Sequence, residues 1–420
     1  MSADTSDATR ATLPDWNSAS VTLERVRPGR TFAGLLATVS VVLLAGALPA
    51  RAHDPGRWVL TGASSVPVYY WQGLTSDPAE TRVFFTGIFE GLWRTTPLLR
   101  QTAGVPSAIP SDVQRAEGYN HIGDPTWNPG DGGRVILPLE CFTPGVGNTC
   151  GTGSFGVADP ATLDFRYYVK LDPAEIPKAM WAETSPDGSL VWTSSGDDLL
   201  AYRSSEVSPA SAAPAGPRLH FAARLAGAVP PSGVTGAVFW HRRLLLAGES
   251  DGTYQVWGVD PRTGNRRLEL EMRICGESEG LDVIPTLGGE LHWLIAPFDP
   301  GCKLTFGPSS ALLHFVPDPG RARFEVEVLD ADVSDLPGTV RVTMRATRRG
   351  RPVNHALVTF AGGTARTDTG GLATVSARLE RPGRFKVLAR KGRSYGLSDL
   401  IPVGIESRAT LRSLPRSGAG

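Results

Sequence analysis

Short runs of apolar residues alternate with turn-forming residues over most of this 420-residue chain. The segment SPDGSLVWTSSGDDLLAY shows the pattern: an Asp-Gly turn, a strand, a turn at Asp197 and Asp198, and a second strand. The runs are short, and no convincing 3.6-residue period separates them. The pattern therefore predicts an all-β protein.

The pattern recurs five times between His53 and about Pro317. Each repeat begins with a polar motif and continues through a turn into an apolar strand and an aromatic-containing strand. The motifs are anchored at Gln72, His121, Glu183, Thr235 and Glu279, so their spacings are 49, 62, 52 and 44 residues. A period near 50 built from short strands is typical of a β-propeller with one four-stranded sheet per blade. A large β-sandwich is the alternative.

Five repeats predict five blades, or six if the segment before the first repeat is a further blade. That segment, GRWVLTGASSVPVYY, is otherwise expected to be an outer strand that pairs with the last blade. A break at 316–323 separates the repeats from a second set of alternating strands, which predicts a small β-sandwich. The expected organisation is a signal peptide at 1–52, a propeller at 53–318, the sandwich at 323–405 and a disordered tail at 406–420.

The chain begins with a predicted export signal. Residues 31–50 carry no charge, follow three arginines, and precede Ala50-Arg51-Ala52, which has the small residues that a signal peptidase reads. An uncleaved membrane anchor is the alternative, because about 20 uncharged residues can also span a bilayer. Both interpretations place the rest of the chain outside the cytoplasm, in the cell envelope or secreted.

Four cysteines fit such an oxidising compartment. The preferred pairing is local: Cys141 with Cys150, and Cys275 with Cys302. A zinc site is disfavoured because the chain has no C-x-x-C motif and no clustered histidines.

The charge of the whole chain is balanced, with 42 Lys and Arg against 42 Asp and Glu, and gives no reason to expect nucleic acid or an anionic surface as partner. Residues 340–410 are an exception, with 14 basic and 4 acidic residues. Their basic side chains either dock on an anionic polymer or form a solvated face that protects strand edges. Because the arginines are spread over several strands, the solvated face is the preferred interpretation.

The polar motifs supply the candidate site. The first strand of each propeller blade lines a central channel, so the motifs are expected to converge there. The expected channel-lining or ligand-binding residues are Gln72, Asn120, His121, Asp124, Glu183, Glu279 and Asp282, while Thr235 contributes little.

These side chains are rich in oxygen, which is the ligand that Ca²⁺ prefers. The possible calcium ligands are Asp124, Glu183 and Glu279, and calcium is the one cofactor considered. The channel could equally bind a polar ligand with His121 as acid or base, or be polar and wet without any ligand. Glu277 lies two residues before Glu279, so the two share a face of a strand and could be paired carboxylates. A strand end that faces solvent is the preferred interpretation.

Two resemblances add to this interpretation. Residues 348–391, with Gly350 to Val353 and Thr367-Asp368 as matched elements, are similar to carboxypeptidase regulatory-like and bacterial Ig-like modules of secreted proteins. That resemblance implies an Ig-like accessory domain without catalytic residues. The motifs YWQGLT, NHIGDP and SEGLDV resemble blade motifs of secreted phytase-like, esterase-like and lactonase-like propellers. In some of those families channel Glu, Asp and Asn residues hold calcium.

The sequence therefore predicts an exported binding or scaffolding protein whose propeller recognises an extracellular polymer, protein or small ligand. The alternative is a calcium-dependent hydrolase of an ester, lactone or phosphoester, although no catalytic residue can be assigned. A purely structural envelope protein is the third possibility. No specific nucleic acid is expected as partner, and membrane contact is expected solely through an uncleaved N-terminal segment.

Overall fold

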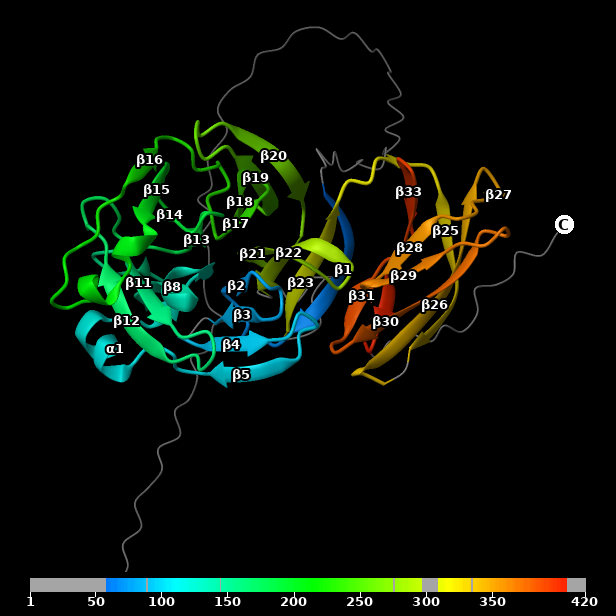
Figure 1. Cartoon of the computed structure of the whole chain (residues 1–420). Coiled ribbons are helices and arrows are strands. Elements are labelled where there is room, and N and C mark those ends of the chain that lie inside the picture. Colours follow the sequence, from blue (N-terminus) through cyan, green and yellow to red (C-terminus); the bar gives the residue numbers. More distant parts are fainter. Residues whose placement is uncertain are drawn as a thin grey trace, which may run out of the picture. The chain divides into compact units, whose positions relative to one another are not determined.

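Five antiparallel sheets of at least four strands each follow one another through residues 58–317 of the computed structural model (Figure 1). The structure describes residues 58–87, 90–143, 145–274, 276–296, 309–333 and 335–405. The first sheet comprises β2 (Gly73–Ser76), β3 (Val83–Thr86), β4 (Leu92–Thr95) and β5 (Gln101–Val105). The second comprises β6 (His121–Ile122), β7 (Thr126–Asn128), β8 (Arg134–Glu140), β11 (Ser154–Ala158) and β12 (Phe165–Lys170).

The remaining three sheets repeat the same order. The third comprises β13 (Glu183–Thr184), β14 (Leu190–Ser195), β15 (Asp198–Arg203) and β16 (Ala223–Leu225). The fourth comprises β17 (Gly236–Trp240), β18 (Arg243–Ser250), β19 (Thr253–Val259) and β20 (Arg266–Met272). The fifth contains β21 (Glu277–Thr286), β22 (Gly289–Ala296), β23 (Ser310–Pro317) and β1 (Trp58–Val66). The prediction of an all-β chain is confirmed; its one described α-helix, α1, spans Ser111–Glu117.

The inner strands of the five sheets contact one another in a cycle. β2 contacts β7 and β21, β13 contacts β7 and β17, and β17 contacts β21. Each inner strand bears one of the polar motifs or follows it directly. The fold thus brings together five short segments that are far apart in the sequence.

The strand β1 completes the fifth sheet, as the sequence predicts for this segment. It pairs with β23 from Trp58 opposite Pro317 to Val66 opposite Ser310. Its other edge pairs with β31 (Gly383–Phe385), which pairs in turn with β34 (Ile401–Val403). The fifth sheet therefore has six strands and runs into the C-terminal part of the chain.

A buried chain of hydrogen bonds joins four strands of this sheet. The Nε2 of His292 lies 2.8 Å from the backbone oxygen of Ile284, which can only accept, so this nitrogen is the donor. In the neutral ring its Nδ1 then accepts from Nδ1 of His314, at 2.8 Å. Nε2 of His314 must therefore accept from the hydroxyl of Ser64, also at 2.8 Å. Each partner has one allowed role, so both tautomers are fixed.

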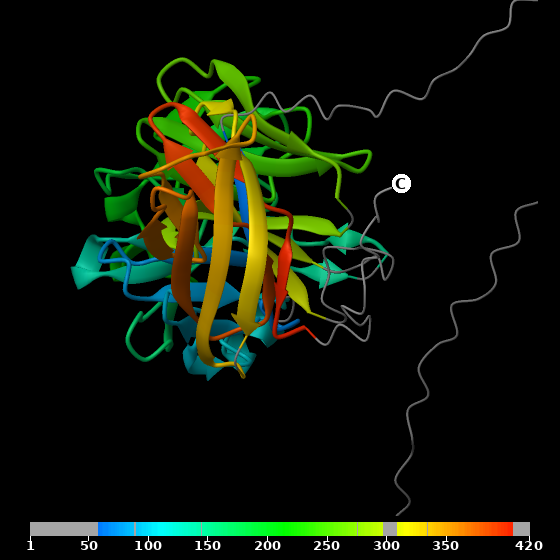
Figure 2. The ribbon, with the colours of Figure 1, turned by 90° about the vertical axis from the view of Figure 1, so that its right-hand side faces the viewer.

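Two further sheets form the C-terminal part, which Figure 2 views from the side opposite the first sheets. One contains β25 (Glu325–Val333), β26 (Gly338–Arg348), β27 (Arg351–Pro352) and β30 (Leu372–Leu379). The other contains β24 (Arg321–Ala322), β33 (Ser394–Leu397), β32 (Leu388–Lys391), β28 (Leu357–Phe360) and β29 (Gly363–Arg366). We call both together the C-terminal sheets.

Strict alternation places one face of these strands in a core. In β26 the side chains of Val340, Val342 and Met344 are buried, and the intervening residues are more exposed. The same hydrophobic cluster includes Phe85 of the first sheet and Phe385 of β31. The described residues therefore belong to one compact unit. The division into a propeller at 53–318 and a sandwich at 323–405 stays a prediction, although one sheet and one hydrophobic cluster contain residues from both of these ranges.

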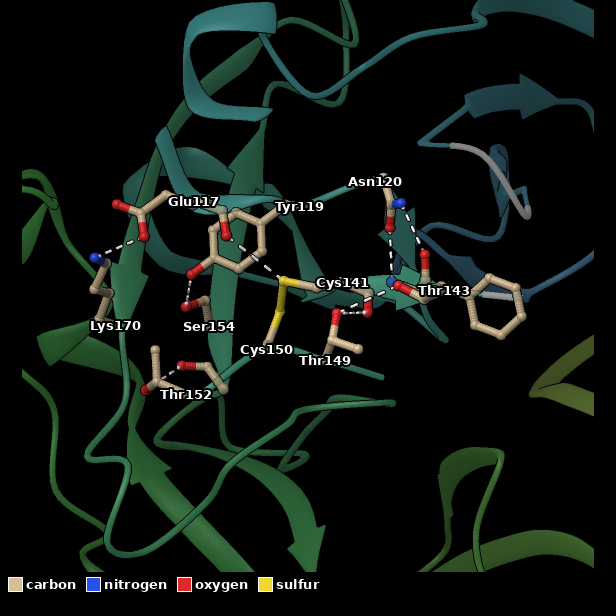
Figure 3. The surroundings of a disulfide bond; sticks show 12 residues. Glu117, Tyr119, Asn120, Cys141, Thr143, Thr149, Cys150, Thr152, Ser154 and Lys170 are labelled. Atoms are coloured by element: carbon tan, nitrogen blue, oxygen red, sulfur yellow. Dashed lines mark hydrogen bonds and ion pairs between the residues drawn. A yellow bond between two sulfur atoms is a disulfide. The ribbon is translucent and has the colours of Figure 1, made fainter. Parts of the chain in front are cut away.

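Several predicted features lie partly or wholly outside the described residues: the export signal, the tail from residue 406, Cys275 and Cys302. No described helix is long and apolar enough to cross a membrane. The pairing of Cys141 with Cys150 is confirmed, and their Cα atoms lie 5.0 Å apart (Figure 3). This bond closes a short loop that carries β9 (Phe142–Thr143) and β10 (Gly147–Asn148).

Candidate ligand-binding site

Asp124 lies where the inner strands meet, and its carboxylate links two other sheets. Its Oδ1 accepts a hydrogen bond from the backbone N–H of Leu74 on β2, at 2.9 Å. Its Oδ2 accepts one from the N–H of Ala237 on β17, at 3.0 Å. The side chain is fully buried. Burial raises the pKa of Asp124 well above its usual value, although the two N–H groups oppose that shift by stabilising the charged form.

Glycines let the inner strands approach Asp124 this closely. A Cβ added to Gly73 would lie 2.4 Å from the Cα of Asp124, and one added to Gly280 would lie 2.5 Å from its Oδ1. Neither position has room for a side chain, because backbone of one strand packs on backbone of the next. The closely packed backbone segments around Asp124, which include Gly73 and Gly280, form a layer that fills the space between the inner strands.

A cavity of about 430 Å³ opens on one side of this layer. We call it the glutamate cavity, because four of its side chains are glutamates. It is lined by Gln72, His121, Glu140, Phe142, Gly147, Lys178, Met180, Thr235, Glu249, Gly276, Glu277 and Glu279.

Three of these glutamates, Glu140, Glu277 and Glu279, have raised pKa values. Burial is the largest cause for Glu279, whose pKa lies well above its usual value, and the charges of Glu277 and Glu249 come next. Burial also raises the pKa of Glu140 to about 7, against the opposing charge of Lys178. The pKa of Glu277 is raised by burial and by Glu249. The cavity therefore holds more acidic groups than it can ionise together without a counter-charge.

One carboxyl oxygen of Glu279 is buried without a hydrogen-bond partner. The residue is 4% exposed, and its Oε1 has no hydrogen-bond partner. A buried acceptor without a donor costs about 1–3 kcal/mol. Glu249, by contrast, accepts from the backbone N–H of Ser278 at 3.0 Å. A donor placed in the cavity would therefore satisfy Oε1 of Glu279.

A histidine and an aromatic ring form the wall opposite the acidic strand. The Nε2 of His121 lies 2.8 Å from Oε1 of Gln72, to which it donates. The ring of Phe142 lies 5.4 Å from the ring of His121, measured between centroids. The backbone groups of Phe142 are held by the side-chain amide of Asn120, which accepts from its N–H at 2.7 Å and donates to its oxygen at 2.9 Å (Figure 3).

Two predicted site residues lie on the other side of Asp124. Glu183 follows Met180 by three residues and Asp282 follows Glu279 by three, or about 10 Å along a strand, and neither lines the cavity. Oε1 of Glu183 accepts from the N–H of Phe239 at 2.8 Å, and its Oε2 accepts from the hydroxyl of Thr126 at 3.0 Å.

The pKa values of both of these carboxyl groups are raised. Burial is the first cause of the raised pKa of Glu183, about 8, and Asp282 adds to it. Burial likewise raises the pKa of Asp282 to about 6. Glu183 and Asp282 thus face each other's charge on one side of Asp124, apart from the glutamates on the other side.

The structure therefore divides the seven predicted site residues into groups. Gln72, His121 and Glu279 line one cavity. Asp124, Glu183 and Asp282 lie in or beyond the layer below it, and Asn120 is exposed. The assignment of calcium to Asp124, Glu183 and Glu279 stays a prediction. In this structure the first two use their oxygens to hold backbone and hydroxyl groups of neighbouring sheets.

Sequence reasoning missed several residues of the cavity. Glu140 and Glu249 lie on β8 and β18, one strand outward from the motifs, so the repeat pattern gave no reason to include them. Glu277 was expected at a solvent-facing strand end, but it is half-buried and lines the cavity together with Glu279. Thr235 was expected to contribute little, yet it also lines the cavity. A signal was present for Glu277, since residues two apart on a strand share a face.

A second group of possible metal ligands lies elsewhere. Among the described residues, Asp172, Glu175 and His220 offer ligand atoms within 4.8 Å of one another. Nδ1 of His220 lies 2.9 Å from Oε1 of Glu175 and 3.4 Å from Oδ2 of Asp172. The imidazole thus pairs with both carboxylates, and these contacts account for the group without an ion.

Comparison with known proteins assigns no family to the chain. No family model matches it, and no curated protein matches it. A solved structure of hydrazine synthase from Kuenenia stuttgartiensis is similar over 81% of this chain and 88% of that chain, with 12% identity and a TM-score of 0.33. A likeness this weak carries no argument about function. The cavity itself is therefore the basis for a functional proposal.

Proposed function

We propose that this chain is an exported binding protein that holds a small organic cation in the glutamate cavity. The observation that carries the proposal is the buried, unpartnered Oε1 of Glu279, which faces a cavity lined by three further glutamates. An ammonium or guanidinium group supplies the missing donors and the missing positive charge together.

The arrangement of the carboxylates favours an organic cation over a compact metal ion. Ca²⁺ needs six to eight oxygens at 2.3–2.6 Å, which requires several carboxylates to converge. Among the described residues, the ligand atoms of Asp172, Glu175 and His220 lie within 4.8 Å of one another, as a metal site requires. No three of the described glutamates of the cavity bring their carboxylate oxygens that close together. An elongated cation with two charged ends can reach carboxylates that lie farther apart. The face of Phe142 offers such a cation a further favourable contact.

The raised pKa values make binding a proton-linked event. Without a cation the glutamates keep protons in order to limit their repulsion. A bound cation replaces those protons, so binding releases them and becomes tighter as the pH rises through about 7, where Glu140 loses its proton.

The arrangement of the sheets is consistent with this proposal. We interpret the five four-stranded sheets, with their cycle of inner strands, as a five-bladed β-propeller whose polar sites lie on its axis. We interpret the C-terminal sheets as a small Ig-like or carboxypeptidase regulatory-like sandwich. The disulfide Cys141–Cys150 supports export to an oxidising compartment.

Calorimetry and thermal unfolding test the proposal with matched probes. The probes are 1,5-diaminopentane and agmatine, and 1,5-pentanediol is the uncharged analogue of the diamine. We expect the two amines to bind and to raise the melting temperature, and the diol to do neither. Glu279→Gln should weaken amine binding about tenfold or more, because it removes the charge and keeps the shape.

Glu290→Gln is the control variant, because Glu290 is an exposed glutamate of β22 that does not line the cavity. The proposal is wrong if the diol binds as well as the diamine, or if both variants lose binding equally. Stabilisation by micromolar Ca²⁺, with no response to either amine, would instead support the calcium-dependent alternative.

A further inference from the structure

Four basic side chains surround an open pocket at one end of the C-terminal sheets. Arg348, Arg349 and Arg351 come from the tight connection between β26 and β27, and Lys391 from the end of β32. We call this the arginine pocket. Its volume is about 820 Å³, and the rest of its lining consists of Phe324, Pro352, Val353, Asn354 and Ser394.

No carboxylate lines this pocket. Other arginines of the same sheets are paired: Arg345 lies 3.7 Å from Glu327, and Arg378 lies 3.1 Å from Glu380. Within the part of the chain that the structure describes, no recorded ion pair includes the four basic residues of the pocket. No described carboxylate therefore forms an ion pair with these four groups, which distinguishes them from a solvated face of mixed charges.

Further arginines increase the positive charge beside the pocket. The backbone N–H of Arg321 donates to the oxygen of Arg393 at 2.8 Å, so the strand that carries Arg321 lies along the turn after Lys391. Arg321, Arg323 and Arg393 are all exposed. The nearby Glu325 accepts from the hydroxyl of Thr347 at 3.1 Å.

The backbone holds two of the arginines in an unfavourable position. Arg348 pairs directly with Arg351 across the β26–β27 ladder. The two residues between them, Arg349 and Gly350, both have positive φ, 52° and 72°, as the two-residue hairpin turn requires. Like charges directly opposite each other on a ladder destabilise a sheet. Features that reduce stability in this way are expected where they serve binding.

The remaining basic group is fixed in place. Nζ of Lys391 donates to the backbone oxygen and to the side-chain oxygen of Asn354, both at 2.8 Å. Its ammonium group is thereby anchored at the rim and loses little freedom when an anion approaches, which favours binding.

We propose that the arginine pocket binds a carboxylate-bearing polysaccharide. Arginine forks match carboxylates with two parallel hydrogen bonds. Asn354 and Ser394 offer hydrogen bonds to sugar hydroxyl groups, and Phe324 and Pro352 offer apolar surface to the C–H faces of a sugar ring. A phosphate polymer without sugar rings would use the charges but not the other four groups. This site is separate from the glutamate cavity and does not depend on what that cavity binds.

Binding of polygalacturonate oligosaccharides to the mature chain tests the proposal, with calorimetry at 50 and 300 mM salt. We expect binding that weakens with salt, because screening reduces charge attraction. Arg348→Gln and Arg351→Gln should each weaken binding about tenfold. Arg341→Gln is the control, because it removes the same charge from β26 seven residues away, or about 23 Å along the strand.

Stability provides an independent readout. Because Arg348 and Arg351 oppose each other in the ladder, either Gln variant should keep or raise the melting temperature while it loses binding. The proposal is overturned if Arg341→Gln loses as much affinity as Arg351→Gln, or if a neutral polysaccharide binds as tightly as the polyuronate. Equal binding of inorganic polyphosphate would also overturn it, since the sugar-specific part of the pocket would then contribute nothing.

Discussion

The substitution Glu183→Gln should remove the loss of stability that the ionisation of this residue causes as the pH rises. The Gln side chain keeps the size of Glu183, its oxygen can accept from the N–H of Phe239, and its amide can donate to Oγ1 of Thr126. The hydroxyl of Thr126 can then turn to the backbone oxygen of Trp127, at 3.2 Å. The variant should therefore fold and differ from the wild type mainly in having no proton to lose.

The size of the effect follows from the two pKa values of Glu183. Its folded pKa is about 8 and its ordinary value is 4.5, so between these pH values the folded state binds more protons than the unfolded state. The stability of the wild type therefore falls as pH rises from 4.5 to 8, by about 1.4 kcal/mol per unit and by about 5 kcal/mol in all. The variant lacks this contribution. We expect the two proteins to be similar at pH 4.5 and the variant to be several kcal/mol more stable at pH 9.

Urea unfolding of both proteins at pH 4.5, 7 and 9 measures this difference, with Glu290→Gln as the exposed control. The reasoning would be refuted if the difference in unfolding free energy between the two proteins did not change with pH. It would also be refuted if the wild type became more stable than the variant at pH 9. The second result would mean that Glu183 is held ionised in the fold. If calcium alone produced that gain, Glu183 would be a metal ligand, as its sequence motif suggested.

Two further predictions concern packing and the buried histidines. Gly123→Ala should cost at least about 3 kcal/mol of unfolding free energy in a urea titration, because its Cβ would lie 1.8 Å from the backbone oxygen of Met180. Gly151→Ala is the control and should be near neutral, since its Cβ would meet nothing within 4 Å. Equal effects of the two substitutions would contradict the packing argument. Ser64→Ala should lower the free energy of unfolding by about 1–3 kcal/mol, because it leaves Nε2 of His314 without its donor. Thermal unfolding measures this loss, with Ser65→Ala as the neighbouring control. An unchanged melting temperature for Ser64→Ala would mean that the hydroxyl group is not needed.

Much of the strand pattern was predictable because its causes are local. The turn at Asp187-Gly188 and the pairing of 190–195 with 198–203 follow from turn chemistry and alternation. The segment 205–220 is different: it connects β15 to β16 within one sheet. Nothing in its Ala- and Pro-rich composition specifies which strands it joins.

The candidate site was predictable in its residue types more than in its geometry. The motifs identified Glu279 and His121, but they did not separate these residues from Glu183 and Asp282. Asp282 lies three residues after Glu279 on the same strand, and this short distance places it on the other side of Asp124. The repeat pattern does not show on which side of Asp124 a polar residue lies. Glu140 follows a run of apolar residues and precedes Cys141 in the sequence, where a polar residue reads as a strand end. Its place in the cavity depends on contacts between sheets, which the local pattern does not encode.

The position of β1 has a consequence for how the protein folds. This strand is made early, yet its partner β23 begins about 250 residues later and β31 about 320 residues later. Contacts of such long range form slowly, because a long loop must close first. Until the chain is complete, both edges of β1 expose unpaired N–H and C=O groups that could pair with another molecule. A chain cut after β23 would leave the edge that β31 covers permanently open, so β31 is expected to protect the fold against aggregation.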